Sequence, residues 1–184
     1  MTAVYVVLGL IALGIVWIIW VYNRLINLRN QKDNGWHQID VQLKRRHDLI
    51  PNLVNTVRGV MDFERGTLTA VIEARSKAMT ATGPADAAVK ENVLTQALGR
   101  LFALAENYPQ LKANENARAL QEELASTENK ISFARQFYND IATKYNIARE
   151  TFPSNLIAGP FGFGRADLFQ VADEAERAVP KVQF

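Results

Sequence analysis

Cysteine is absent from this 184-residue chain, and histidine occurs twice. Without thiols the sequence excludes disulfide bonds, a thiolate nucleophile, and zinc or iron–sulfur sites built on cysteine. The formal net charge is only +2, so no strong electrostatic attraction to nucleic acid is expected. We therefore predict neither cysteine chemistry nor a nucleic acid partner.

Charge is missing from the N-terminal segment. Residues 3–22 contain no charged side chain and no proline. As a helix they would be about 30 Å long, which matches the hydrocarbon core of a bilayer. Trp17, Trp20 and Tyr22 gather at one end, where aromatic side chains favour the headgroup level. We predict that residues 1–22 form a transmembrane anchor.

A cleaved signal peptide is the alternative for this segment. No basic residue precedes the apolar run, and Trp-Ile-Ile-Trp at 17–20 does not resemble a cleavage site made of small residues. Both observations favour a retained anchor.

The residues after the anchor are basic. Between Asn23 and Ile50 there are six basic and three acidic residues, a balance of +3. The positive-inside rule places the short N-terminus outside and the large C-terminal domain in the cytoplasm. Within this stretch we predict that Lys44, Arg45 and Arg46 contact lipid headgroups or another subunit. An ordinary solvated basic face is the alternative.

Beyond the anchor, apolar residues recur at helical spacing, with little of the alternation typical of strands. The pattern predicts a helix that breaks or kinks near Pro51 and ends near Ala78, followed by helices at 85–107 and 117–150. Helices with one apolar face each must bury these faces against one another. We therefore predict an all-α fold: an elongated antiparallel bundle over residues 23–152, with coiled-coil-like packing.

Each of the last two helices has a predicted buried face. For helix 85–107 the face is Val89, Val93 or Leu94, Ala97, Leu101 and Leu104. For helix 117–150 it is Leu120, Leu124, Thr127, Ile131, Ala134, Phe137 or Tyr138, Ile141 and Tyr145. A Tyr-Asn pair at 138–139 repeats at 145–146. These polar groups either form a hydrogen-bonded seam or face solvent.

Residues 153–184 differ in composition and are predicted to be a separate C-terminal tail. Residues 153–169 are rich in glycine, proline and phenylalanine, and a short amphipathic helix is expected around 167–178. No GxxxxGK[ST] motif accompanies the glycines, which argues against a phosphate loop. We predict that Phe161, Phe163 and Phe169 are oligomer contacts. Insertion into the headgroup layer and packing onto the chain's own bundle are the alternatives.

Three segments resemble a known family. They are GWHQIDVQLKRRHDLIPNLVNTV (35–57), TENKISFARQFYNDIATKYN (127–146) and FPSNLIAGPFGF (152–163). Together they resemble the LemA family of bacterial membrane proteins. The resemblance implies one membrane helix in the bacterial inner membrane, followed by an all-α antiparallel bundle.

The family's biochemical role is poorly defined. Some relatives are linked to building magnetosome membranes, and others are encoded beside membrane proteases or membrane partners. No family catalytic residues can be transferred to this chain. Many relatives have histidine where this chain has Phe63, and serine where it has His37.

The remaining residues offer no catalytic constellation. His37 and His47 would lie about 15 Å apart on a straight helix, too far to share a metal. His47 is expected to make a polar contact with the adjacent Asp48. We predict no enzymatic activity, no cofactor or metal, and no small-molecule substrate.

The predicted function is that of a non-enzymatic scaffold or assembly protein. It would bind membrane lipids and self-associate at the membrane surface as a homo-oligomer. The alternative is an accessory subunit of a membrane protein partner, such as a membrane protease.

Overall fold

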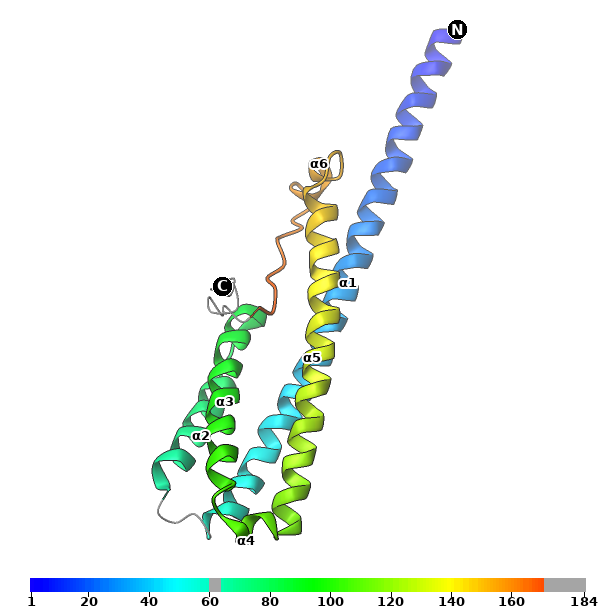
Figure 1. The fold of residues 1–184 in the computed structure, drawn as a ribbon. Coiled ribbons are helices and arrows are strands. Elements are labelled where there is room, and N and C mark those ends of the chain that lie inside the picture. Colours follow the sequence, from blue (N-terminus) through cyan, green and yellow to red (C-terminus); the bar gives the residue numbers. More distant parts are fainter. Residues whose placement is uncertain (60–63, 171–184) are drawn as a thin grey trace, which may run out of the picture. The chain divides into compact units, whose positions relative to one another are not determined.

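The computed structural model describes residues 1–59 and 64–170 (Figure 1). This part of the chain is all-α, as predicted, and contains no strand. Its helices are α1 (Thr2–Arg58), α2 (Arg65–Ala78), α3 (Gly83–Ala105), α4 (Pro109–Lys112), α5 (Glu115–Glu150) and α6 (Asn155–Ala158).

The first helix, α1, begins in the apolar segment. At 57 residues it is about 85 Å long. Most of its large apolar side chains between Val4 and Trp20 are exposed. It is long and apolar enough to cross a membrane, and a bilayer removes the unfavourable contact of these side chains with water. The structure and the sequence thus agree on a membrane protein with an N-terminal membrane helix.

Of the break or kink predicted near Pro51, the break is wrong, because α1 continues through this proline to Arg58. The helix ends instead before Gly59, a residue type that favours helix C-termini. A separate helix, α2, starts at Arg65. The expected continuous helix from residue 50 to Ala78 is therefore two helices, and the residues between 59 and 64 lie outside the described part.

Arg75 of α2 accounts for the tolerance of Pro51 within α1. Proline has no N–H, so the carbonyl four residues earlier, at His47, loses its helical donor. The Nε of Arg75 donates a hydrogen bond to this carbonyl oxygen at 2.6 Å. A side chain of α2 thus replaces the missing bond and ties α2 to α1.

This arrangement predicts coupling between positions 51 and 75. Arg75→Met should lower the free energy of unfolding by about 1–2 kcal/mol, because it leaves the His47 carbonyl unsatisfied. In a Pro51→Ala background the alanine N–H can serve the carbonyl, so the same substitution should have a smaller effect. A double-mutant cycle from urea unfolding in detergent measures the difference. Equal effects of Arg75→Met in both backgrounds would contradict this role.

The chain packs as two compact units. The anchor unit comprises residues 1–40 and 132–168, and the hairpin unit comprises the described residues of 41–131 together with 169 and 170. In the anchor unit, Lys32 Nζ lies 5.8 Å from the centre of the Tyr145 ring, and the Trp36 ring contacts that of Tyr138. Since one residue number rises as the other falls, α1 and α5 run antiparallel here. The domain boundaries predicted at residues 22 and 152 remain predictions.

The hairpin unit contains α2 and α3 as an antiparallel hairpin (Figure 1). Its core is aliphatic and includes Ile50, Leu53, Val71, Leu94 and Leu101. Burying each such side chain contributes roughly 1.5–3 kcal/mol. This core holds α3 so that one defined face of the helix is turned inward.

That inward face of α3 matches the predicted one only in part, since Leu101 and the alternative Leu94 are buried as predicted. Val89 and Val93 are exposed, whereas the buried residues are Ala87, Ala88, Glu91, Leu94, Leu98 and Leu101. The predicted face did not include Glu91, whose carboxylate is costly to bury unless it is paired. On α5 the predicted alternative Tyr138 is buried, and Phe137 is largely exposed.

Candidate functional site

A cluster of charged side chains lies buried in the hairpin unit. Arg46 is 3% exposed and Glu91 is 4% exposed. The Nη1 of Arg46 lies 3.2 Å from Glu91 Oε2 and 3.1 Å from Glu128 Oε2, and its Nη2 donates to the Thr95 hydroxyl at 2.8 Å. His47 Nε2 lies 2.6 Å from Glu91 Oε1. We call these five residues the charge cluster.

Helical spacing brings the charge cluster together. Arg46 and His47 are consecutive on α1, and Glu91 and Thr95 are four apart on α3, so the latter share a face. Glu91 uses its two oxygens for two different partners, and Arg46 uses two nitrogens. Burial of such groups is tolerated when they are paired and hydrogen-bonded. These side chains satisfy one another's charges and hydrogen-bonding groups. The charge cluster therefore stabilises the packing of α1 against α3.

The three basic residues predicted to contact lipid or another subunit, Lys44, Arg45 and Arg46, have different environments in the structure. Lys44 is exposed. Arg45 forms an ion pair with Glu123 and is half-exposed. Arg46 is buried in the charge cluster, so its guanidinium faces carboxylates. A role of this stretch in lipid or subunit contact remains a prediction, with Lys44 and Arg45 as its accessible members.

The histidines do not approach each other as ligands of one metal. His37 is exposed, and His47 contacts Glu91 in place of the expected Asp48. Within residues 1–59 and 64–170, no group of three or more His, Asp or Glu side chains is placed to hold a metal ion.

The second polar constellation lies in the anchor unit, where α5 holds the tail. Asn146 donates from Nδ2 to the Ala166 carbonyl at 2.9 Å and accepts from the Ala166 N–H at 2.9 Å. The Tyr145 hydroxyl donates to the Gly164 carbonyl at 2.9 Å, and the Tyr138 hydroxyl donates to the Asp167 carbonyl at 2.6 Å. Arg149 Nε donates to the Phe163 carbonyl at 2.6 Å. We call this arrangement the tail clasp.

The tail clasp explains the repeated Tyr-Asn pairs. Tyr138, Tyr145 and Asn146 take part in a hydrogen-bonded seam, and their partners are backbone groups of the chain's own tail. Burial, together with the negative charges of Asp167 and Asp33, raises the pKa of Tyr138 to about 12. Burial also raises the pKa of Tyr145. Both phenols therefore stay protonated and remain donors at neutral pH.

The three predicted contact phenylalanines have different environments. Phe163 and Phe169 are buried, while Phe161 is 56% exposed. Phe163 lies 5.6 Å from the Tyr22 ring, with the Arg29 guanidinium 5.4 Å from its own ring centre. Gly162, between Phe161 and Phe163 in the sequence, has a φ of +70°, a conformation that favours glycine. Of the three, Phe161 is the one available to another molecule.

The helix expected around residues 167–178 lies mostly outside the described residues. Residues 167–170 are described and are not helical.

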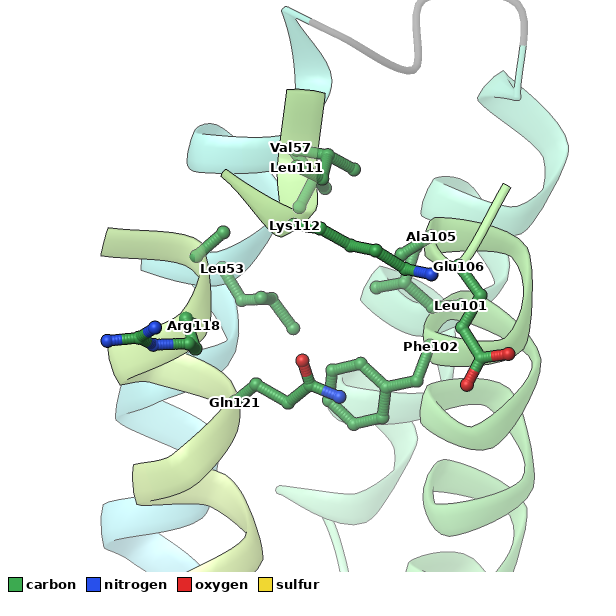
Figure 2. Close-up of a pocket in the computed structure, with 11 residues that line it drawn as sticks. Leu53, Val57, Leu101, Phe102, Ala105, Glu106, Leu111, Lys112, Arg118 and Gln121 are labelled. Carbon is green, nitrogen blue, oxygen red and sulfur yellow. The ribbon is translucent and has the colours of Figure 1, made fainter. Parts of the chain in front are cut away.

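The hairpin unit also contains a cavity of about 360 Å³. Figure 2 shows side chains from α1, α3, α4 and α5 around it, including the apolar Leu53, Leu101 and Phe102. The polar lining residues are Glu106, Lys112, Arg118 and Gln121. They form none of the ion pairs or hydrogen bonds with one another that mark a built polar site, so we assign the cavity no chemistry.

The residues that sequence reasoning missed are the acidic partners Glu91 and Glu128 and the clasp residue Arg149. A signal for Glu91 exists in the sequence, because Ala87, Ala88, Leu94, Leu98 and Leu101 share its helical face. The partner helix that compensates its charge cannot be identified from this spacing.

Comparisons with known proteins agree with the fold. The chain is 27% identical to Protein LemA of Metamycoplasma hominis over 179 residues, covering 94% of this chain and 80% of the relative. It is 26% identical to Magnetosome protein MamQ 2 of Paramagnetospirillum magneticum, covering 81% of this chain and 64% of the relative. Magnetosome protein MamQ of Magnetospirillum gryphiswaldense is 24% identical, with 80% and 64% covered.

The chain therefore spans less than two thirds of the length of the MamQ relatives. None of these names denotes an enzyme. A family model described as the LemA family matches residues 35–184. Since this match covers most of the chain, including α5 and the tail clasp, the chain belongs to the LemA family.

Proposed function

We propose that this protein is a non-enzymatic scaffold that is anchored in the membrane and self-associates at its surface. The observation that carries the proposal is an exposed aromatic pair on α5. Phe133 is 75% exposed and Phe137 is 47% exposed, and four residues separate them. Residues at this spacing are neighbours on a helix surface. Exposed apolar patches of this kind mark interaction sites.

The anchor favours a second copy as the partner of this pair. A membrane helix holds every copy in one plane and one orientation, so the aromatic pairs lie at equal height. Confinement to a plane also raises the local concentration, which makes a weak lateral contact effective. Copies in parallel orientation favour a cyclic array over a two-fold dimer with opposed anchors.

The polar groups support a structural role for the rest of the domain. Arg46, His47 and Glu91 are engaged with one another. Tyr138 and Asn146 are engaged with the tail. These contacts stabilise the chain itself. The exposed apolar groups are the ones that remain accessible to another molecule.

The orientation belongs to the same proposal. The basic residues after the anchor favour a cytoplasmic domain and an external N-terminus at the inner membrane of a bacterium.

The test is the mass of the full-length protein in mild detergent. Wild type should form a large homo-oligomer at micromolar concentration. Phe133→Ser with Phe137→Ser should weaken association ten-fold or more, because both rings leave the contact. Light scattering coupled to size-exclusion chromatography measures the mass.

Val89→Ser with Val93→Ser is the matched control. This pair is also exposed and four apart, on α3, and its substitution should leave the mass unchanged. A wild-type protein that stays monomeric across micromolar concentrations would remove the scaffold proposal. The alternative, an accessory subunit of a membrane enzyme such as a protease, would then take its place.

A further inference from the structure

A second group of exposed apolar residues lies at the end of the anchor unit. Phe152 is 74% exposed, Leu156 is 63% exposed and Phe161 is 56% exposed. They belong to the turn that leaves α5, to α6, and to the turn after it. We call these three residues the apolar tip. Gly162, with its φ of +70°, lets the chain reverse directly after the tip.

The apolar tip lies at the membrane end of the unit. The ring of Phe161 is 5.3 Å from that of Tyr22, the last residue of the apolar segment of α1. Figure 1 shows α6 at the end of α5 in this unit. Aromatic residues at the ends of a span mark the headgroup level. The contact with Tyr22 therefore places Phe161 at that level, outside the span itself.

Next to the tip is a groove of about 500 Å³ with basic residues. Its polar lining includes Arg24 and Asn27 of α1, Lys144 of α5, and Thr151 and Ser154 after that helix. Arg24 follows Tyr22 by two residues, about 3 Å along the helix. Its guanidinium also lies 5.6 Å from the Trp20 ring centre. The groove thus opens at the depth where lipid phosphates lie.

The charge of the groove is positive and uncompensated within the described residues. Neither Arg24 nor Lys144 forms an ion pair there. The nearby Glu150 is engaged with Arg149 at 3.3 Å and with Arg165 at 3.9 Å. Two cations and the Ser154 hydroxyl beside a membrane span suit an anionic phosphate headgroup, while the Thr151 hydroxyl donates to the Ile147 carbonyl.

We propose that the apolar tip and this groove form a second membrane-contact element, which docks the end of the anchor unit on anionic phospholipid. Phe152, Leu156 and Phe161 enter the boundary between headgroups and acyl chains. Arg24 and Lys144 bind the lipid phosphate. This element is independent of the self-association proposed for Phe133 and Phe137, and it assigns the lipid contact to residues other than Lys44–Arg46.

The absence of native cysteine allows a direct measurement of depth. A nitroxide at Leu156→Cys, in full-length protein reconstituted into bilayers of phosphatidylcholine with phosphatidylglycerol, should be several-fold more accessible to oxygen than to a water-soluble nickel complex. The same label at Glu122, an exposed residue of α5 about 16 Å along the helix from Phe133, should show the reverse. Preferential access of nickel at position 156 would overturn the proposal. So would spin–spin broadening with low access to both reagents, which would show a second copy covering the tip.

The lipid preference tests the groove. Spin-labelled lipids report the relative association of phosphatidylglycerol and phosphatidylcholine with the reconstituted protein. Arg24→Gln with Lys144→Gln should lower the preference for phosphatidylglycerol by five-fold or more, given about five-fold per charge near a membrane surface. Arg118→Gln with Lys130→Gln removes the same charge outside the groove and should leave the preference intact.

Two outcomes would contradict the groove assignment. If both double variants lost the preference for phosphatidylglycerol equally, the preference would depend on the net charge of the protein and not on the groove. Abolition of the preference by millimolar inorganic phosphate would identify a soluble-phosphate site instead of a lipid site. Failure of self-association in detergent bears on the scaffold proposal and leaves these lipid measurements unaffected.

Discussion

Replacing Glu91 with leucine is expected to lower the free energy of unfolding of the hairpin unit by about 3–5 kcal/mol. The substitution removes the carboxylate that pairs with both Arg46 and His47. Arg46 keeps Glu128 as a partner, but Glu128 is half-exposed and cannot replace a buried carboxylate. His47 loses its partner for Nε2. Urea unfolding in detergent, followed by circular dichroism, measures the loss.

Two controls separate the buried pair from charge in general. Glu123→Ala breaks the more exposed ion pair with Arg45 and should lower the free energy of unfolding by at most about 1 kcal/mol. Arg46→Met combined with Glu91→Leu should be less harmful than Glu91→Leu alone, because no guanidinium then remains buried without its partner. Equal effects of Glu91→Leu and Glu123→Ala would show that the charge cluster contributes no more than a surface ion pair.

Replacing Asn146 with leucine is the second large perturbation, and its effect should be local. The side-chain amide satisfies both the N–H and the carbonyl of Ala166. Loss of two buried hydrogen bonds should favour release of the tail by about 2–3 kcal/mol. Amide exchange at Ala166 should then accelerate by a factor of about 30–150, since each 1.4 kcal/mol corresponds to a factor of ten. Hydrogen–deuterium exchange over residues 163–167 reports this change.

Asn129→Leu is the matched control for this experiment. It makes the same substitution at an exposed position of the same helix, α5. It should leave exchange over residues 163–167 unchanged. Unaltered protection of Ala166 in Asn146→Leu would mean that the hydrogen bonds of Tyr138, Tyr145 and Arg149 hold the tail without the amide.

The two constellations have a common consequence for function. Each uses polar side chains to fix one segment against another: α3 against α1 in the hairpin unit, and the tail against α5 in the anchor unit. Rigid segments present exposed groups such as Phe133, Phe137 and the apolar tip in defined positions. Lower conformational freedom before binding reduces the entropy lost on association. Fixed surfaces of this kind suit a scaffold.

The sequence by itself determined the anchor, the all-α class and the approximate helices. An uncharged run of 20 residues and apolar periodicity are local properties, and no partner segment is needed to interpret them. The same holds for the end of α5 before Pro153, since proline stops a helix through its own geometry. The end of α1 before Gly59 was equally local, but it was overlooked because apolar residues at helical spacing continue beyond it.

Tertiary structure decided the features that depend on a partner distant in sequence. Pro51 was expected to break or kink the helix, yet α1 continues through it, and Arg75, 28 residues from His47, supplies the lost donor. Glu91 was not part of the predicted buried face of α3, and it is Arg46, 45 residues away, that compensates its charge. The Tyr-Asn repeat was ambiguous until the tail supplied its backbone partners. In each case a local penalty, a missing hydrogen bond or a buried charge, is removed by a contact that sequence spacing does not encode.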